Sequence, residues 1–225
     1  MARQLVLALP HRPALGREDF LVAASNETAV ALIDAWPGWS AHMLVLSGPA
    51  GSGKTHLAEV WRMRSGARRI EPGELPQADI PALVASGPLV LEGIDTLSEK
   101  GERALFHLVN LTREEGGFLL MTSRTAPAQH PFGLPDLASR LRAAPHAELG
   151  APDDGLLAGV LAKLFDDRQL NVPDTLIPYL LPRMERSVEA ARALVAALDE
   201  ASLAGKRPLG PRLAAEILDR PDTQD

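Results

Sequence analysis

Eight consecutive residues, Gly48 to Thr55, constrain the fold of this chain more than any other feature. They match the pattern G-x-x-x-x-G-K-[ST] in full, between the apolar run Met43–Leu46 and a helical pattern that runs from Lys54 to about Ser65. A continuous apolar run is typical of a strand buried on both faces of a parallel sheet. A strand, a glycine-rich loop and a helix in this order predict a phosphate-binding loop in a parallel α/β fold.

The residue types in this motif fit the binding of a nucleotide. Glycines let backbone N–H groups converge on phosphates, and the helix N-terminus adds partial positive charge. We expect Lys54 to reach the β- and γ-phosphates and the Thr55 hydroxyl to ligate Mg²⁺. The imidazole of His56 is expected to pack against the helix rather than act as a base. The expected nucleotide contacts here are Gly48, Pro49, Ala50, Gly51, Ser52, Gly53, Lys54, Thr55 and His56.

A carboxylate at the end of a neighbouring strand completes the Mg²⁺ site of such a loop. Glu92 directly follows the apolar run Leu89–Leu91 and is the expected second metal residue; the alternative is an ordinary loop acid. Many ATPases carry another carboxylate immediately afterwards, which activates the attacking water. Here that position is Gly93, and Asp95 is expected to point elsewhere. The sequence therefore predicts weak or no ATPase activity of the chain by itself.

Hydrophobic periodicity divides the chain into three parts. Residues 1–18 are expected to form a tail, residues 19–151 an α/β nucleotide-binding domain, and residues 152–225 a small all-α lid domain. The expected strands are 43–46, 68–71, 88–91, 118–121 and 146–149. The expected helices are 25–35, 54–65, 98–115, 136–141, 153–166, 173–184, 187–204 and 211–219. Pro178 and Pro182 predict a kink or a split in the helix at 173–184.

Composition excludes several classes of function. The 225 residues are 46% hydrophobic and 23% charged, which is ordinary for a globular protein. The chain has no cysteine, so disulfides, zinc–thiolate sites and cysteine nucleophiles are excluded. A net charge of −6 argues against direct binding to DNA, so any DNA association is expected to be indirect. Without a membrane-length apolar run or a signal-peptide pattern, we expect a cytoplasmic location and no membrane partner.

The phosphate-binding loop and the all-α C-terminal part together resemble the AAA+ class, and within it the DnaA branch of replication initiators. The resemblance extends over about residues 19–220. The segments that carry it are Asp19–Val22 with Ser25-Asn26, Leu119–Ser123 with Pro127, and Leu137–Leu141. The segments Phe106–Asn110 and Leu164–Leu170 are similar to α-proteobacterial members of the Hda family, short DnaA homologues that inactivate DnaA after initiation.

The tail also resembles a feature of the Hda family, its clamp-binding peptide. The peptide corresponds to Gln4, Leu5, Leu7 and Leu9. In an extended segment the three leucines lie on one side, where an apolar groove can take them, and the glutamine can anchor one end by hydrogen bonds. The resemblance implies the DNA polymerase III β sliding clamp as a partner. The alternative is an edge strand of the domain itself.

Arg140 matches the arginine-finger position of the DnaA family. A guanidinium that enters a neighbour's ATP site neutralises charge developing on the γ-phosphate, which contributes about 10³–10⁵ in rate. The resemblance implies that the recipient site belongs to DnaA, so that Arg140 would be catalytic in trans. Two alternatives stay open, a surface arginine at the end of a short helix and a role for the nearby Arg142.

The resemblance also implies further contacts to the nucleotide, which would be ADP or ATP with Mg²⁺. Ser123 falls at the sensor-1 position, and Arg124 stands where DnaA proteins have an acid. The sensor-2 arginine falls at Glu189 in a gapless alignment, so Arg192 or Arg186 would replace it from the lid. The adenine is expected near Leu21, Val22 and Asn26. The Hda resemblance implies ADP as the working ligand.

Three function classes follow from these observations. The first is a regulator that, with the DNA-loaded clamp, stimulates hydrolysis of DnaA-bound ATP; it would act as a monomer or as a nucleotide-controlled homodimer. The second is a helicase-loader-like ATPase or another clamp-tethered AAA+ adaptor, against which Gly93 and the net charge of −6 argue. The third is a P-loop kinase of a small metabolite, which would need neither the helical C-terminal part nor the Arg140 segment.

Overall fold

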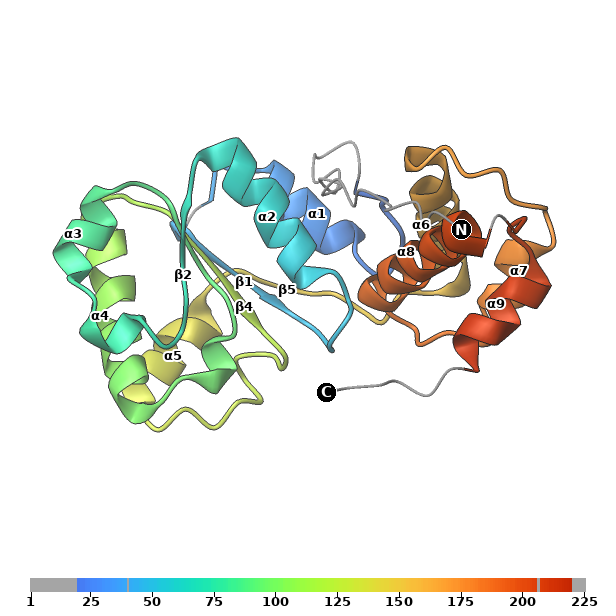
Figure 1. Cartoon of the computed structure of the whole chain (residues 1–225). Coiled ribbons are helices and arrows are strands. Elements are labelled where there is room, and N and C mark those ends of the chain that lie inside the picture. The colour runs from blue at the N-terminus through green and yellow to red at the C-terminus, as the bar shows by residue number, and fades with distance from the viewer. Residues whose placement is uncertain (1–19, 40, 206, 220–225) are drawn as a thin grey trace. The chain divides into compact units, whose positions relative to one another are not determined.

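A computed structural model describes residues 20–39, 41–205 and 207–219 of the chain (Figure 1). The chain divides into two compact units at Ala151–Pro152. We call the described residues before this point the N-terminal unit and those after it the C-terminal unit. Gln4, Leu5, Leu7 and Leu9 lie outside the described residues.

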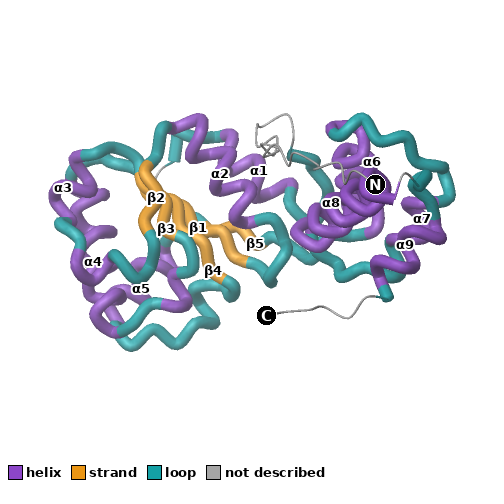
Figure 2. Tube along the Cα trace, in the orientation of Figure 1, coloured by secondary structure: helices purple, strands orange, loops and turns teal. Residues whose placement is uncertain are grey.

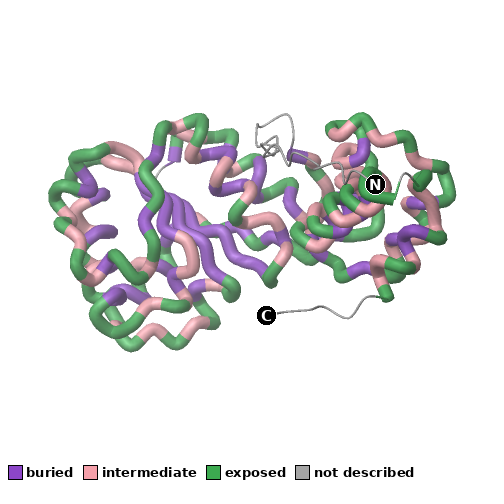
Figure 3. Tube along the Cα trace, in the orientation of Figure 1, coloured by how far each residue is buried: buried purple, intermediate pink, exposed green. Residues whose placement is uncertain are grey.

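The N-terminal unit is built on a five-stranded sheet, drawn in orange in Figure 2. The strands are β1 (Met43–Ser47), β2 (Arg68–Ile70), β3 (Leu89–Leu91), β4 (Leu119–Ser123) and β5 (His146–Glu148). Their order in the sheet is β2-β3-β4-β1-β5, and every pair is parallel. Figure 3 shows the sheet as the most buried part of this unit, as expected for strands covered on both faces. The predicted strands are thus confirmed.

Helices cover both faces of this sheet (Figure 1). Leu44, Leu46 and Leu120 pack with α1 and α2, whereas their strand neighbours Met43, Val45 and Leu119 pack with α3, α4 and α5. Side chains alternate between the two faces along each strand, which explains why successive residues join different cores. The helices are α1 (Glu27–Asp34), α2 (Lys54–Ser65), α3 (Ile80–Ala85), α4 (Glu99–Glu114) and α5 (Pro135–Ala143), with short 3₁₀ turns η2 (Leu75–Gln77) and η3 (Ile94–Thr96).

Polar side chains cap the starts of α4 and α3, of which the sequence predicted only α4. Ser98 accepts a hydrogen bond of 3.3 Å from the Gly101 N–H and caps α4, as predicted. Helix α3 was not predicted within the proline-rich segment 67–87. It begins after Asp79, which accepts a 3.1 Å bond from the Ala82 N–H, and has Pro81 in its first turn. A capping carboxylate and an early proline thus stabilise a helix of only six residues.

In the C-terminal unit the described residues form helices without strands. The helices are α6 (Asp154–Asp167), α7 (Leu176–Leu180), α8 (Val188–Gly205) and α9 (Pro211–Leu218). They share one core that includes Leu157, Leu161, Phe165, Val195 and Leu198. The helix predicted over 173–184 is too long. Only its central part, Leu176–Leu180, is helical. The helix ends before Pro182, because proline has no N–H with which to continue the hydrogen bonding of a helix.

Candidate nucleotide-binding site

The glycine-rich loop of the motif follows β1 and passes close to the end of β5. Gly48 has a φ of 149°, and a Cβ atom added there would overlap the carbonyl oxygen of Leu149 and lie 2.9 Å from Ser52 Oγ. The Leu149 N–H also donates a 2.7 Å bond to the carbonyl of Ser47. Only glycine therefore fits at the first position of the loop, because both its backbone angle and its surroundings exclude a side chain.

Helix α2 presents its N-terminus to this loop. Its N-cap is Gly53, at φ 94°, which has no side chain to cover the N–H groups of the first turn. Lys54 Nζ donates 2.7 Å hydrogen bonds to the carbonyls of both Gly48 and Pro49. The ammonium group is thus held against the loop, beside the N–H groups, in an arrangement that attracts phosphate oxygens.

Thr55 joins this helix to the end of β3. Its Oγ1 donates a hydrogen bond of 2.6 Å to Glu92 Oε2. The sequence placed Glu92 on a neighbouring strand, but β4 lies between β1 and β3. The contact still forms because Glu92 follows the β3 residue Val90 on the face that α2 covers. A hydroxyl and a carboxylate are oxygen ligands of the kind that Mg²⁺ takes together with phosphates.

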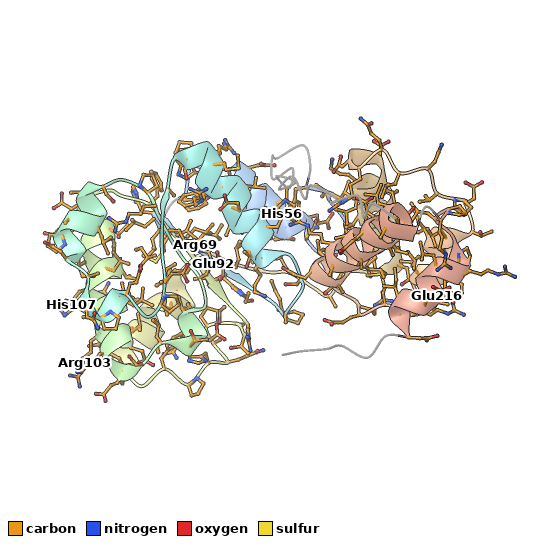
Figure 4. The ribbon with its side chains drawn as sticks, viewed as in Figure 1. His56, Arg69, Glu92, Arg103, His107 and Glu216 are labelled. Atoms are coloured by element: carbon orange, nitrogen blue, oxygen red, sulfur yellow. The ribbon has the colours of Figure 1, made fainter. Side chains whose placement is uncertain are left out.

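Arg69 of β2 is a member of this site that sequence analysis missed. Its Nη1 lies 3.3 Å from Glu92 Oε1, and its Nε donates a 2.9 Å bond to Glu71 Oε1. In the parallel pair of β2 and β3, Arg69 is in register with Val90. Because side chains alternate, Arg69 and Glu92 face the same side of the sheet, where Figure 4 shows them next to each other. The sequence shows only an arginine in a short predicted strand. That Arg69 lies beside Glu92 could not be predicted without the order of the strands in the sheet.

The residues after Glu92 turn away from it. Gly93 takes a left-handed conformation, at φ 70°, and begins η3. Asp95 Oδ1 accepts a 3.0 Å hydrogen bond from the Arg124 N–H beyond β4. The Asp95 carboxylate is therefore bound at the end of β4, in agreement with the expectation that it points elsewhere.

Two hydroxyl groups lie at the end of β4. Thr122 Oγ1 accepts a 3.1 Å bond from the Gly93 N–H and so ties β4 to the end of β3. Ser123 is buried, and its Oγ accepts a 3.3 Å bond from the Thr125 N–H. The sequence indicated Ser123, and not Thr122, as a candidate site residue. Alternation along β4 puts Thr122 on the same face as Leu120, which is the face of α2.

The segment before α1 lies against the start of α2. Phe20 is buried, and its ring packs edge-on against His56 at 5.1 Å between ring centroids. The packing role expected for the His56 imidazole is thus confirmed. Asn26 Nδ2 donates to the Leu21 carbonyl and Asn26 Oδ1 accepts from the Ala23 N–H, each at 2.9 Å. Asn26 therefore holds the turn that carries Leu21 and the exposed Val22.

Arg140 lies on α5, on the face of the sheet opposite α2. Its guanidinium carbon is 5.4 Å from the ring centroid of Phe106 on α4, within the range of a cation–π contact. Arg142 is exposed. Buried Glu102 of α4 accepts hydrogen bonds from the N–H groups of Gly133, at 3.2 Å, and Leu134, at 2.9 Å, and so holds the residues immediately before α5.

The two lid arginines of the sequence analysis lie in the C-terminal unit. Arg186 Nη1 forms a 2.6 Å ion pair with Asp154, and its Nη2 donates a 3.1 Å bond to the carbonyl of Pro152. These contacts tie Arg186 to the start of α6. Arg192 is half-buried on α8, one turn beyond Glu189.

Two absences hold for the part of the chain that the structure describes. None of its helices has the length and apolar composition needed to cross a bilayer. Nor do three or more of its histidine, aspartate and glutamate side chains gather where they could hold a metal ion by themselves.

No protein-family model matches the chain. Solved structures match it over most of its length. Domain III of the Thermotoga maritima replication initiation protein DnaA aligns with a TM-score of 0.78 and 17% identity, over 94% of this chain and 98% of that one. AMPPCP-bound DnaA from Aquifex aeolicus aligns at 0.70 and 19%, over 86% and 68% of the two chains. The RuvB Holliday junction branch migration motor of Thermotoga maritima aligns at 0.65 and 18%, over 79% and 61%. The chain has the AAA+ fold of these proteins, as predicted.

Proposed function

We propose that this chain is an Hda-type regulator of chromosome replication initiation, which stimulates the hydrolysis of ATP bound to DnaA. The observation that carries the proposal is the place of Arg140. It lies on α5, on the face of the sheet opposite α2, the helix that follows the phosphate-binding loop. Its guanidinium lies against the ring of Phe106. An arginine there would serve the nucleotide site of another molecule rather than that of its own chain.

In this proposal Arg140 completes the active site of DnaA in trans. Hydrolysis of ATP spreads negative charge over the γ-phosphate, and a guanidinium neutralises it through planar, paired hydrogen bonds. An arginine supplied by a partner contributes about 10³–10⁵ in rate. DnaA would thereby pass from its ATP-bound to its ADP-bound form.

The chain's own site would bind a nucleotide without hydrolysing it. Lys54 and the N-terminus of α2 would bind the phosphates, with Thr55 and Glu92 as ligands of any Mg²⁺. Leu21 and Val22 would contact the base, Ser123 would act as sensor, and Arg192 would be the lid arginine. The position after Glu92 is Gly93, and the Asp95 carboxylate is bonded to the Arg124 N–H. This lack of a base beside Glu92 supports ADP as the working ligand and counts against an ATP-driven loader.

The proposed link to DNA is the sliding clamp. Gln4, Leu5, Leu7 and Leu9 would dock as an extended peptide in an apolar groove of the clamp. The clamp encircles DNA, so an acidic chain with a net charge of −6 would reach DnaA at the replication fork without binding DNA itself.

The test is the hydrolysis of labelled ATP preloaded on DnaA, with clamp on DNA and this protein with ADP. We expect acceleration by the wild-type chain and by Arg142→Ala, and none by Arg140→Ala. Arg140→Ala should still bind the clamp. Acceleration by Arg140→Ala would overturn the assignment of the arginine, and no acceleration by the wild-type chain would overturn the function.

A second variant tests the docking peptide. Gln4→Ala combined with Leu5→Ala should abolish binding to the clamp in a pull-down, while the affinity for ADP stays that of the wild type. Wild-type clamp affinity in this double variant would show that the tail is not the docking peptide.

A further inference from the structure

Both oxygens of the Glu92 carboxylate have partners within the N-terminal unit. Thr55 Oγ1 donates to Oε2 at 2.6 Å, and Arg69 Nη1 lies 3.3 Å from Oε1. Figure 4 shows Arg69 and Glu92 side by side. The carboxylate that a P-loop protein uses to hold the Mg²⁺ shell is therefore paired here with a permanent positive charge.

Several contacts keep the Arg69 guanidinium in this place. Its strand β2 pairs with β3, with Arg69 in register with Val90, two residues before Glu92. Its Nε is bonded to Glu71 at 2.9 Å. The Glu92 side chain is 15% exposed and the Arg69 side chain 44% exposed, so solvent reaches this ion pair mainly from the Arg69 side.

Electrostatics on α2 agrees with a guanidinium at this position. The pKa of Glu59 is lowered, chiefly by its hydrogen bonds with Arg62, and the charge of Arg69 contributes in the same direction. The charge of Arg69 therefore acts on the side of the sheet on which α2 lies.

A divalent cation bound beside Glu92 would lie close to the positive charge of the Arg69 guanidinium. Two positive charges within several ångströms repel each other, and the carboxylate that would attract the metal already has a cationic partner. Arg69 thus weakens the binding of Mg²⁺ while it adds positive charge to a site that has to hold phosphates.

We propose that Arg69 provides within the chain the positive charge that Mg²⁺ otherwise brings to Glu92, so that the site binds ADP without a metal ion. This inference rests on the nucleotide site of the proposed function, but not on the arginine finger or the clamp peptide. It assigns Arg69 as the residue that determines the metal dependence of the site.

The test compares the dissociation constant of ADP in excess EDTA with that in excess Mg²⁺, by calorimetry on the full chain. The variant is Arg69→Gln, which keeps a polar side chain and removes the charge. The matched control is Arg68→Gln, the preceding arginine of β2, which lines a separate surface pocket of about 300 Å³ with Ile70 and Leu83. Thermal melting checks that both variants fold.

We expect the wild-type chain and Arg68→Gln to bind ADP with affinities that differ less than about threefold between EDTA and Mg²⁺. In Arg69→Gln, Mg²⁺ should raise the affinity about tenfold or more, the factor expected when a unit charge is removed within several ångströms of a divalent ion.

Two outcomes would overturn the inference and can be told apart. Equal metal dependence in Arg69→Gln and the wild type would make the Arg69–Glu92 contact a purely structural ion pair and leave the nucleotide site intact. Absence of ADP binding by the wild-type chain in both conditions would remove the nucleotide site itself, and with it that part of the proposed function.

Discussion

The Arg140 guanidinium lies over the ring of Phe106, 5.4 Å from its centroid, so that a side chain of α5 is in cation–π contact with an aromatic ring of α4. Phe106 is partly buried against the core that α4 and α5 share. The ring thus has two roles, since one part of it packs into the core and its face holds a cation. The two roles can be separated by substitution.

Phe106→Leu should lower the stimulation of DnaA ATP hydrolysis about two- to fivefold, because leucine keeps the apolar packing but cannot hold the guanidinium through a cation–π contact of about 0.5–1 kcal/mol. Phe106→Tyr, which retains the ring, should behave as the wild type. The rate of hydrolysis of labelled ATP on DnaA is the measurement, with clamp binding as the control. Full stimulation by Phe106→Leu would mean that the ring does not orient Arg140.

Glu102→Ala should lower the free energy of unfolding by about 2–3 kcal/mol, because the N–H groups of Gly133 and Leu134 lose a buried, charged acceptor at the start of α5. Urea denaturation measures this change. Glu99→Ala is the matched control on the same helix, where the exposed pair with Arg103 contributes under about 0.5 kcal/mol. Equal stability of the two variants would contradict a stabilising role of the hydrogen bonds that Glu102 accepts.

Much of this fold could be predicted because the sequence signals are local. The buried strands are continuous apolar runs, and the helix after the loop begins at the lysine of the motif. Helix α4 was predicted from its cap and its apolar stripe. Helix α3 was missed because its six residues are too few to show a periodicity, so that only Asp79 and Pro81 mark it.

The parts of the site that were missed depend on which strands are neighbours. Arg69 and Thr122 approach the end of β3 only because β2 and β4 flank it in the sheet. No spacing along the chain contains that information. Glu92 was found because a carboxylate after a buried strand is itself a local pattern.

Gly48→Ala should destabilise the chain by at least about 2 kcal/mol and abolish ADP binding, because the new Cβ would overlap the Leu149 carbonyl in a backbone conformation that alanine rarely adopts. Urea denaturation and calorimetry with ADP are the measurements. At Gly73, an added Cβ would meet no atom of the described residues within 4 Å, so Gly73→Ala is the control and should change neither property. Wild-type stability of Gly48→Ala would show that the loop can move away from β5.

His146 and Ser47 form a hydrogen-bonded pair at the edge of the sheet, with 2.6 Å between His146 Nε2 and Ser47 Oγ. Burial lowers the pKa of His146, against an opposing effect of Glu148. Above the ordinary histidine pKa of about 6.5, His146 is neutral in both the folded and unfolded chains, and its contribution to stability is complete. As the pH falls below about 6.5, the unfolded chain binds a proton that the folded chain does not, so the free energy of unfolding decreases until the lower, folded pKa is reached.

His146→Gln keeps a hydrogen-bonding side chain and removes the titration. The midpoint of urea denaturation should therefore fall more in the wild type than in His146→Gln between about pH 7.5 and pH 5.5. An equal decrease in both proteins would assign the pH dependence to other groups.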